Sequence, residues 1–329
     1  MIRTRLVAGA AAFAILAAAC GAASGGTPTL PGQSPAPGRP VTEAWAEIVG
    51  GLDAPFSDRE ATICHRGDPA CLGAVVGEME ARLALLGCAH TAPFAFTYLE
   101  MTRGVAEAVD TFDDPALISV VDARFAQLYF DAIDNWTAGR IDDVPAAWQL
   151  AFSGADDGTQ SATLDLILGM NAHISRDLAY VVAQVVADDP LITDEPDDYR
   201  FVNEIIAAVK SPMLAGAAER FDPNLFLLDA DLDLVDAPDP VSLIAQWRSV
   251  AFELGRRLAR ADTEAARRAV VAEIERNAAA GAAVLRAAAA VDGSQEIAAE
   301  IAAGGAGVRF LTPAERDAYC EATADDAAP

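Results

Sequence analysis

Residues 169–182 read "GMNAHISRDLAYVV" and lie in the longest apolar stretch of the chain outside its N-terminal segment. Their apolar side chains recur at the spacing of a helix face, so they predict one helix over about 160–187. The "DDP" at 188–190 ends that helix. A helix with so few polar residues needs neighbouring helices over most of its surface, and this requirement decides the fold class.

Nearly every segment on either side also predicts a helix. Thr91 with Pro93, and Asp114 with Pro115, have the order of capping residue and early proline that helix starts prefer. Only residues 225–235, "LFLLDADLDLV", partly alternate as a strand does. We therefore predict an all-α fold, a multi-helix bundle with a C-terminal alanine-rich helical hairpin. The other predicted helices cover 42–52, 69–88, 91–110, 113–139, 144–152, 197–210, 240–261, 263–290, 294–303 and 313–322.

The first twenty residues, "MIRTRLVAGAAAFAILAAAC", predict a secretory signal peptide. Arg3 and Arg5 precede an apolar run over 6–19, which is too short for the about 20 residues of a membrane-spanning helix. The final "LAAAC" resembles a bacterial lipobox, in which Cys20 would be lipidated, although Ala17 replaces the usual leucine. The alternative is an ordinary signal peptide in which the cysteine is incidental.

Residues 21–40 follow as a flexible tether, because half of them are Gly or Pro and almost none can be buried. Residues 41–329 are predicted to form the helical domain. The sequence "DAPDP" at 236–240 is its weakest point, where a subdivision into two domains is the alternative. Together these features predict an exported protein whose partner is the membrane, through a lipid on Cys20 at the outer face of the cytoplasmic membrane.

Four further cysteines are Cys64, Cys71, Cys88 and Cys320. An even number in an exported chain favours two disulfides over four free thiols. Of the three pairings, we favour Cys64 with Cys71, because "CHRGDPAC" resembles a turn that a bridge could close. Cys88 then pairs with Cys320.

The formal net charge is −26 over 329 residues. This argues against nucleic acid and against anionic lipid headgroups as partners, because both require a basic surface.

His173 and Asp177 are the leading candidates for a chemical site. At i and i+4 of the predicted helix they are neighbours, and they could hold a divalent metal or act as base and orienter. A metal would need at least one further ligand. On a helical wheel, however, they share a stripe with Asp165 and Gln184. That stripe either faces solvent, or belongs to a central helix and faces an internal cleft. Structural hydrogen bonding is a third interpretation.

Asn171 lies in the middle of the apolar side of the same helix. An unpaired buried amide costs about 1–3 kcal/mol, so Asn171 must have a partner. That partner is either a neighbouring helix or a ligand, and Asn171 is therefore a candidate ligand-binding residue.

Three more polar residues lie on apolar helix faces. Tyr98 and Thr102, one turn apart, are candidate ligand-binding residues. Asp122 is a third candidate catalytic residue beside His173 and Asp177, because a buried carboxylate needs a donor or a cation. Its partner could be Tyr98 or His173, and exposure at the edge of the helix is the alternative.

The segments "APFAFTYLEMTRGV", "FAQLYFDAIDNW", "VPAAWQLAF" and "LGMNAHISRDL" occur in this order. They resemble an uncharacterised helical family from actinobacteria that is known only as a domain of unknown function. The resemblance covers roughly residues 90–210, and its most specific part is the motif N-A-H-I-x-x-D-L, which places Asn171, His173 and Asp177. It implies an all-helical fold and brings no established activity.

The leading interpretation is a lipid-anchored extracytoplasmic helical protein that binds a small molecule or an envelope protein. The alternative is a metal-dependent or His/Asp-based hydrolase with its site around His173 and Asp177. A purely structural envelope protein also agrees with the sequence, which does not decide whether the chain is an enzyme.

Overall fold

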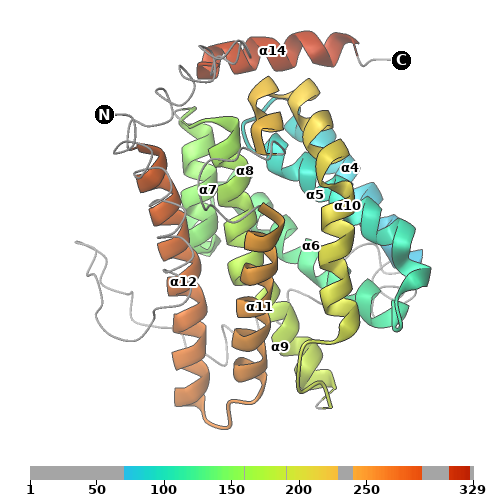
Figure 1. The fold of residues 1–329 in the computed structure, drawn as a ribbon. Coiled ribbons are helices and arrows are strands. Elements are labelled where there is room, and N and C mark those ends of the chain that lie inside the picture. The colour runs from blue at the N-terminus through green and yellow to red at the C-terminus, as the bar shows by residue number, and fades with distance from the viewer. Residues whose placement is uncertain (1–69, 159, 190, 229–239, 291–310, 327–329) are drawn as a thin grey trace, which may run out of the picture.

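The computed structural model describes residues 70–158, 160–189, 191–228, 240–290 and 311–326, and these form an all-α multi-helix bundle (Figure 1). No strand occurs in these ranges. The α-helices are α4 (Ala70–Leu86), α5 (Ala92–Ala108), α6 (Pro115–Thr137), α7 (Ala146–Asp156), α8 (Ala162–Ala172), α9 (Leu178–Asp188), α10 (Asp197–Arg220), α11 (Pro240–Ala259), α12 (Glu264–Ala290) and α14 (Pro313–Asp326). Short 3₁₀ turns cover Val109–Thr111, Ile141–Asp143 and Pro223–Leu228.

Several helix starts are fixed by side-chain caps. The Asp114 side chain accepts a hydrogen bond from the Leu117 amide at 2.9 Å, with Pro115 in the first turn. Ser161 caps α8 in the same way. Thr91 occupies the predicted N-cap position of α5, but its side chain makes no capping hydrogen bond. The sequence therefore predicts where α5 begins without predicting how its first amides are satisfied.

The predicted helix over 160–187 is present and lies at the centre of the bundle. It consists of α8, a π-helical turn over His173–Asp177 and α9. α8 packs on α7 and α12, and α9 packs most extensively on α11. Because helices surround it, Asp165, His173 and Asp177 are buried. The solvent-facing interpretation of their stripe is therefore wrong.

α10 continues ten residues beyond its predicted end at 210 and contains Pro212. A proline inside a helix leaves the carbonyl four residues earlier without its amide partner. Here both Pro212 and Ala208 lie on the exposed side of α10, where water can satisfy that carbonyl. Pro212 therefore does not end the helix, because it lies on the side of α10 that faces the solvent.

α11 and α12 run antiparallel as a helical hairpin, with the alanine-rich α12 as its second member (Figure 1). Of the stretch 225–235 that partly alternates, the described residues 225–228 belong to the 3₁₀ turn Pro223–Leu228 rather than to a strand. The predicted helix over 294–303 and the "DAPDP" boundary lie outside the described residues.

α14 lies across one end of the bundle (Figure 1). The predicted disulfide between Cys88 and Cys320 attaches it to the segment after α4, with 5.8 Å between the two Cα atoms. In addition, the buried guanidinium of Arg316 donates to Asp165 at 3.0 and 3.1 Å and to the Gln160 carbonyl at 2.7 Å. A covalent bond and a buried ion pair therefore hold the C-terminal helix to the central one.

The remaining N-terminal predictions fall outside the described residues. These are the signal peptide over 1–20, Cys20, the tether over 21–40, the helix over 42–52 and Cys64 as the partner of Cys71. None of the helices that the structure describes has both the length and the apolar character needed to cross a membrane.

Candidate functional site

The π turn brings His173 and Asp177 together. Its last hydrogen bond joins the Leu178 amide to the His173 carbonyl, five residues earlier. The Nδ1 atom of His173 lies 3.0 Å from Oδ2 of Asp177. Single π turns inside α-helices occur frequently at functional sites. The predicted His–Asp pair is therefore present, inside the protein.

Both oxygens of the Asp177 carboxylate have further donors. The indole nitrogen of Trp148, on α7, donates to Oδ2 at 2.9 Å, and Arg176 donates to Oδ1. Arg176 in turn bonds Glu275 of α12 at 2.9 Å, and the Tyr180 hydroxyl donates to the same oxygen at 2.7 Å. Opposite charges and hydrogen bonds thus compensate the burial of this fully enclosed carboxylate.

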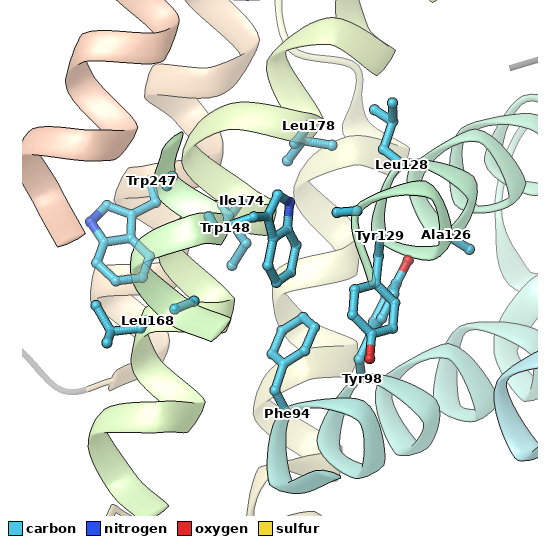
Figure 2. Close-up of a cluster of buried hydrophobic side chains, with 14 of the residues drawn as sticks. Phe94, Tyr98, Ala126, Leu128, Tyr129, Trp148, Leu168, Ile174, Leu178 and Trp247 are labelled. Atoms are coloured by element: carbon cyan, nitrogen blue, oxygen red, sulfur yellow. The ribbon is translucent and has the colours of Figure 1, made fainter. Parts of the chain in front are cut away.

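The imidazole of His173 is buried among aromatic rings. It stacks on Phe125 with ring centroids 3.5 Å apart and contacts the Tyr98 ring edge to face at 4.5 Å. Burial lowers the pKa of His173 in spite of the nearby Asp177. The neutral ring donates through Nδ1, and its Nε2 atom has no partner among the described residues. In Figure 2 several of the surrounding rings form one cluster: Phe94, Tyr98, Tyr129 and Trp148.

Asn171 forms a structural hydrogen bond, as one of its two interpretations predicted. Its side-chain amide donates to the Ala278 carbonyl on α12 at 2.8 Å, and the Ser175 hydroxyl donates to its oxygen at 3.3 Å. Gly281 permits this approach, because a Cβ atom there would lie 2.5 Å from that oxygen. Asn171 therefore joins α8 to α12.

A cavity of about 70 Å³ lies between α5, α6, α9, α10 and α11. Aliphatic side chains such as Val105, Val121 and Val182 form most of its wall. Tyr98 and Phe125 also line it, whereas His173 does not. These two rings therefore separate the cavity from the His173–Asp177 pair.

Three polar side chains with unpaired oxygen atoms line the same cavity. The hydroxyl groups of Tyr98 and Thr102 and one carboxylate oxygen of Asp122 are buried without a hydrogen-bond partner in the described part of the chain. All three come from α5 and α6, at positions that the sequence analysis selected.

Asp122 is buried rather than exposed at an edge, so that alternative is wrong. Burial raises the pKa of Asp122 to about 7. The pKa of Tyr98 is raised by burial and then by the charges of Asp122 and Asp177. Neither of the predicted partners bonds Asp122: Tyr98 stands near it without a hydrogen bond, and His173 bonds Asp177 instead.

Arg248 on α11 also lines the cavity, and the sequence analysis missed it. It is buried, and its guanidinium lies 4.4 Å from the Tyr199 ring centre and donates to the Tyr199 carbonyl at 2.7 Å. Its Nε atom has no partner among the described residues. The sequence could have indicated it, because Arg248 lies four residues from both Ile244 and Phe252 and so on the apolar face of its helix.

The geometry does not fit a metal ion at His173 and Asp177. Within the described residues, no three His, Cys, Asp or Glu side chains lie close enough to hold one. Both oxygens of Asp177 already accept hydrogen bonds from Trp148 and Arg176, which leaves only Nε2 of His173 as a ligand.

Residues 72–288 match a family of unknown function, DUF5995, and the chain therefore belongs to that family. The match extends from α4 to the second helix of the hairpin and so exceeds the stretch of the predicted resemblance on both sides. No curated protein and no solved structure matches the chain.

The raised pKa of Asp122 generates a stability prediction. An ionised Asp122 is unfavourable in the folded state, so stability is lost as the pH rises from about 4 to about 7. Asp122→Asn removes this penalty. It should raise the free energy of unfolding by up to about 4 kcal/mol at pH 8, and the gain should shrink below pH 7 and vanish near pH 4.

Urea denaturation of both proteins at pH 4, 6 and 8 measures this. Asp142→Asn, on an exposed residue, is the control and should change little at any of these values. An equal effect of Asp122→Asn at all three pH values would contradict the prediction.

Proposed function

We propose that the protein binds a small molecule in the cavity between α5, α6, α9, α10 and α11. The observation that carries the proposal is the set of three polar side chains on the apolar wall, Tyr98, Thr102 and Asp122, each with one oxygen atom that has no partner among the described residues. An apolar cavity with a few convergent polar groups is the usual form of a small-molecule site.

The unpaired groups reduce the stability of the fold, since each buried polar atom without a partner costs about 1–3 kcal/mol. A core selected for stability alone would have apolar side chains of similar shape at these positions. A ligand that exchanges hydrogen bonds with Tyr98, Thr102 and Asp122 would recover part of this energy. With a pKa of about 7, the Asp122 carboxyl can either donate or accept near neutral pH.

The test is a titration of the full-length protein with 2-butanol, followed by NMR of the valine and leucine methyl groups. We expect shifts at Val182 and at other methyl groups of the cavity wall. Val121→Phe, which places a larger side chain at a partly exposed position of the wall, should weaken binding at least tenfold.

Leu85→Phe is the matched control, because Leu85 is 89% exposed and distant from the cavity wall. It should leave the titration unchanged. If the alcohol shifts no methyl group of the cavity, or if Val121→Phe binds it as the wild type does, the cavity is not the binding site.

We further propose that the protein is exported and anchored by a lipid on Cys20. The supporting features are the signal-like residues 1–20, the lipobox-like "LAAAC" and the Gly- and Pro-rich residues 21–40. The disulfide between Cys88 and Cys320 agrees with this proposal, since such bonds persist mainly in oxidising compartments.

Metabolic labelling with an alkyne analogue of palmitate tests the anchor. The wild type should be labelled and should sediment with the membranes, whereas Cys20→Ala should lose the label and leave the membrane fraction. Ser24→Ala, in the tether, is the control. Retention of label by Cys20→Ala would refute the anchor at this residue.

A second candidate function is a hydrolase that uses His173 as a base oriented by Asp177. The observation that favours it is the Nε2 atom of His173, which has no partner among the described residues and lies opposite the nitrogen that bonds Asp177. In such pairs the carboxylate fixes the tautomer and leaves Nε2 to accept a proton. This candidate is the weaker one, because His173 does not line the cavity and because a third metal ligand is missing among the described residues.

Hydrolysis of 4-nitrophenyl butyrate, measured together with the metal content, tests this candidate. If it is correct, His173→Gln lowers kcat/KM at least 100-fold, since general-base catalysis contributes about 10²–10⁴-fold. His90→Gln is the matched control, because His90 pairs with Asp317 elsewhere in the structure. A wild-type rate equal to that of buffer, without stoichiometric metal, would exclude this function.

A further inference from the structure

Arg248 differs from the other buried arginines. Arg176 pairs with Asp177 and Glu275, and Arg316 pairs with Asp165. Arg248 is 7% exposed, as Arg176 is, yet no carboxylate of the described residues forms an ion pair with it. It is the buried arginine that lines the cavity.

An uncompensated buried cation is unfavourable, because the interior solvates the charge far less well than water. The hydrogen bond to the Tyr199 carbonyl and the contact with the Tyr199 ring compensate only part of this loss. Accordingly, burial lowers the pKa of Arg248. Among the described acidic residues, Glu195 acts on Arg248 electrostatically and opposes this lowering of the pKa, but it forms no ion pair with the guanidinium.

The polar groups of the cavity wall come from two sets of helices. Arg248 and Tyr199 come from α11 and α10, whereas Tyr98, Thr102 and Asp122 come from α5 and α6. Burial raises the pKa of Asp122, and no ion pair joins it to Arg248. The first set therefore offers a cation, and the second offers hydrogen-bonding groups.

We propose that the ligand is a short-chain monocarboxylate whose carboxylate pairs with Arg248 while its carbon chain lies among the valines of the wall. This rests on the proposed small-molecule site. Arginine matches the planar shape of a carboxylate and can bond both of its oxygens. Among the described residues of the wall only Arg248 is basic, so a second negative charge would be buried without a cation and a dicarboxylate is disfavoured.

The volume limits the length of the chain. An engineered apolar cavity of about 150 Å³ holds benzene, which has six carbon atoms. By the same ratio a cavity of about 70 Å³ holds about three carbon atoms. Three carbon atoms correspond to the chain of butyrate beyond the carboxylate that pairs with Arg248.

The experiment compares butyrate, its neutral analogue butyramide and the dianion succinate by calorimetric and NMR titration of the full-length protein. The wild type should bind butyrate at least tenfold more tightly than butyramide or succinate. In Arg248→Gln the ratio of butyrate to butyramide affinity should fall to within about twofold of one. Arg256→Gln is the matched control, because it makes the same change of charge at a more exposed position of α11 and should keep the ratio.

The variant Arg248→Lys distinguishes the loss of the positive charge from a loss of folding. It retains a cation and should keep a preference for butyrate of at least fivefold, even where Arg248→Gln is too unstable to measure. Equal binding of butyrate and butyramide to the wild type would overturn the proposal, as would loss of the preference in Arg248→Lys or its survival in Arg248→Gln. If 2-butanol binds and butyrate does not, the proposal of a carboxylate ligand fails, whereas the proposed small-molecule site in the cavity is retained. If neither binds, the proposed function fails as well.

Discussion

The buried carboxylate of Asp177 is the interaction on which the rest of this structure depends. It is completely enclosed, and it accepts hydrogen bonds from Trp148 on α7 and from His173 and Arg176 on its own π turn. Through Arg176 the network reaches Glu275 on α12. Removing one member of such a network typically costs about 3–5 kcal/mol, because a charge is then left uncompensated. The central helix is therefore held to two of its neighbours by electrostatics as well as by apolar packing.

The pairing of both Asp177 oxygens contrasts with the neighbouring cavity. Tyr98 and Phe125 contact His173 on one side and line the cavity on the other. On the network side both carboxylate oxygens of Asp177 are bonded, whereas the hydroxyls of Tyr98 and Thr102 and one oxygen of Asp122 have no partner in the described part of the chain. Proteins depart from complete pairing mainly at functional sites, where the loss of stability is offset by binding. The contrast within a few side chains favours the cavity over the His–Asp pair as the proposed site.

The sequence predicts the fold well, because helix starts and apolar periodicity are local properties. Asp114 with Pro115 and the apolar stretch around residue 170 are examples. It also predicts that Asn171 needs a partner and that Cys88 pairs with Cys320. The π turn is different. One extra residue in a helical turn has no sequence signature, and it rotates every later side chain about the axis, so a wheel at about 100° per residue misplaces the faces of α9.

What joins distant helices is harder to predict. The position of Asp122 on an apolar face was visible, but whether a donor reaches it depends on distances between α5 and α6 that only the folded chain defines. Arg248 could have been found by the same wheel analysis, since it lies between Ile244 and Phe252. That it forms no ion pair with any described carboxylate could not have been predicted, because this requires knowing which carboxylates of a strongly acidic chain lie near it.

The charge of the protein gives the proposed ligand a further consequence. A net charge of −26 repels an approaching anion over about a Debye length, and this slows association. The attraction of Arg248 acts at short range inside the cavity, where screening is weak. The preference for a carboxylate then comes from a slower dissociation rate rather than from a faster association rate.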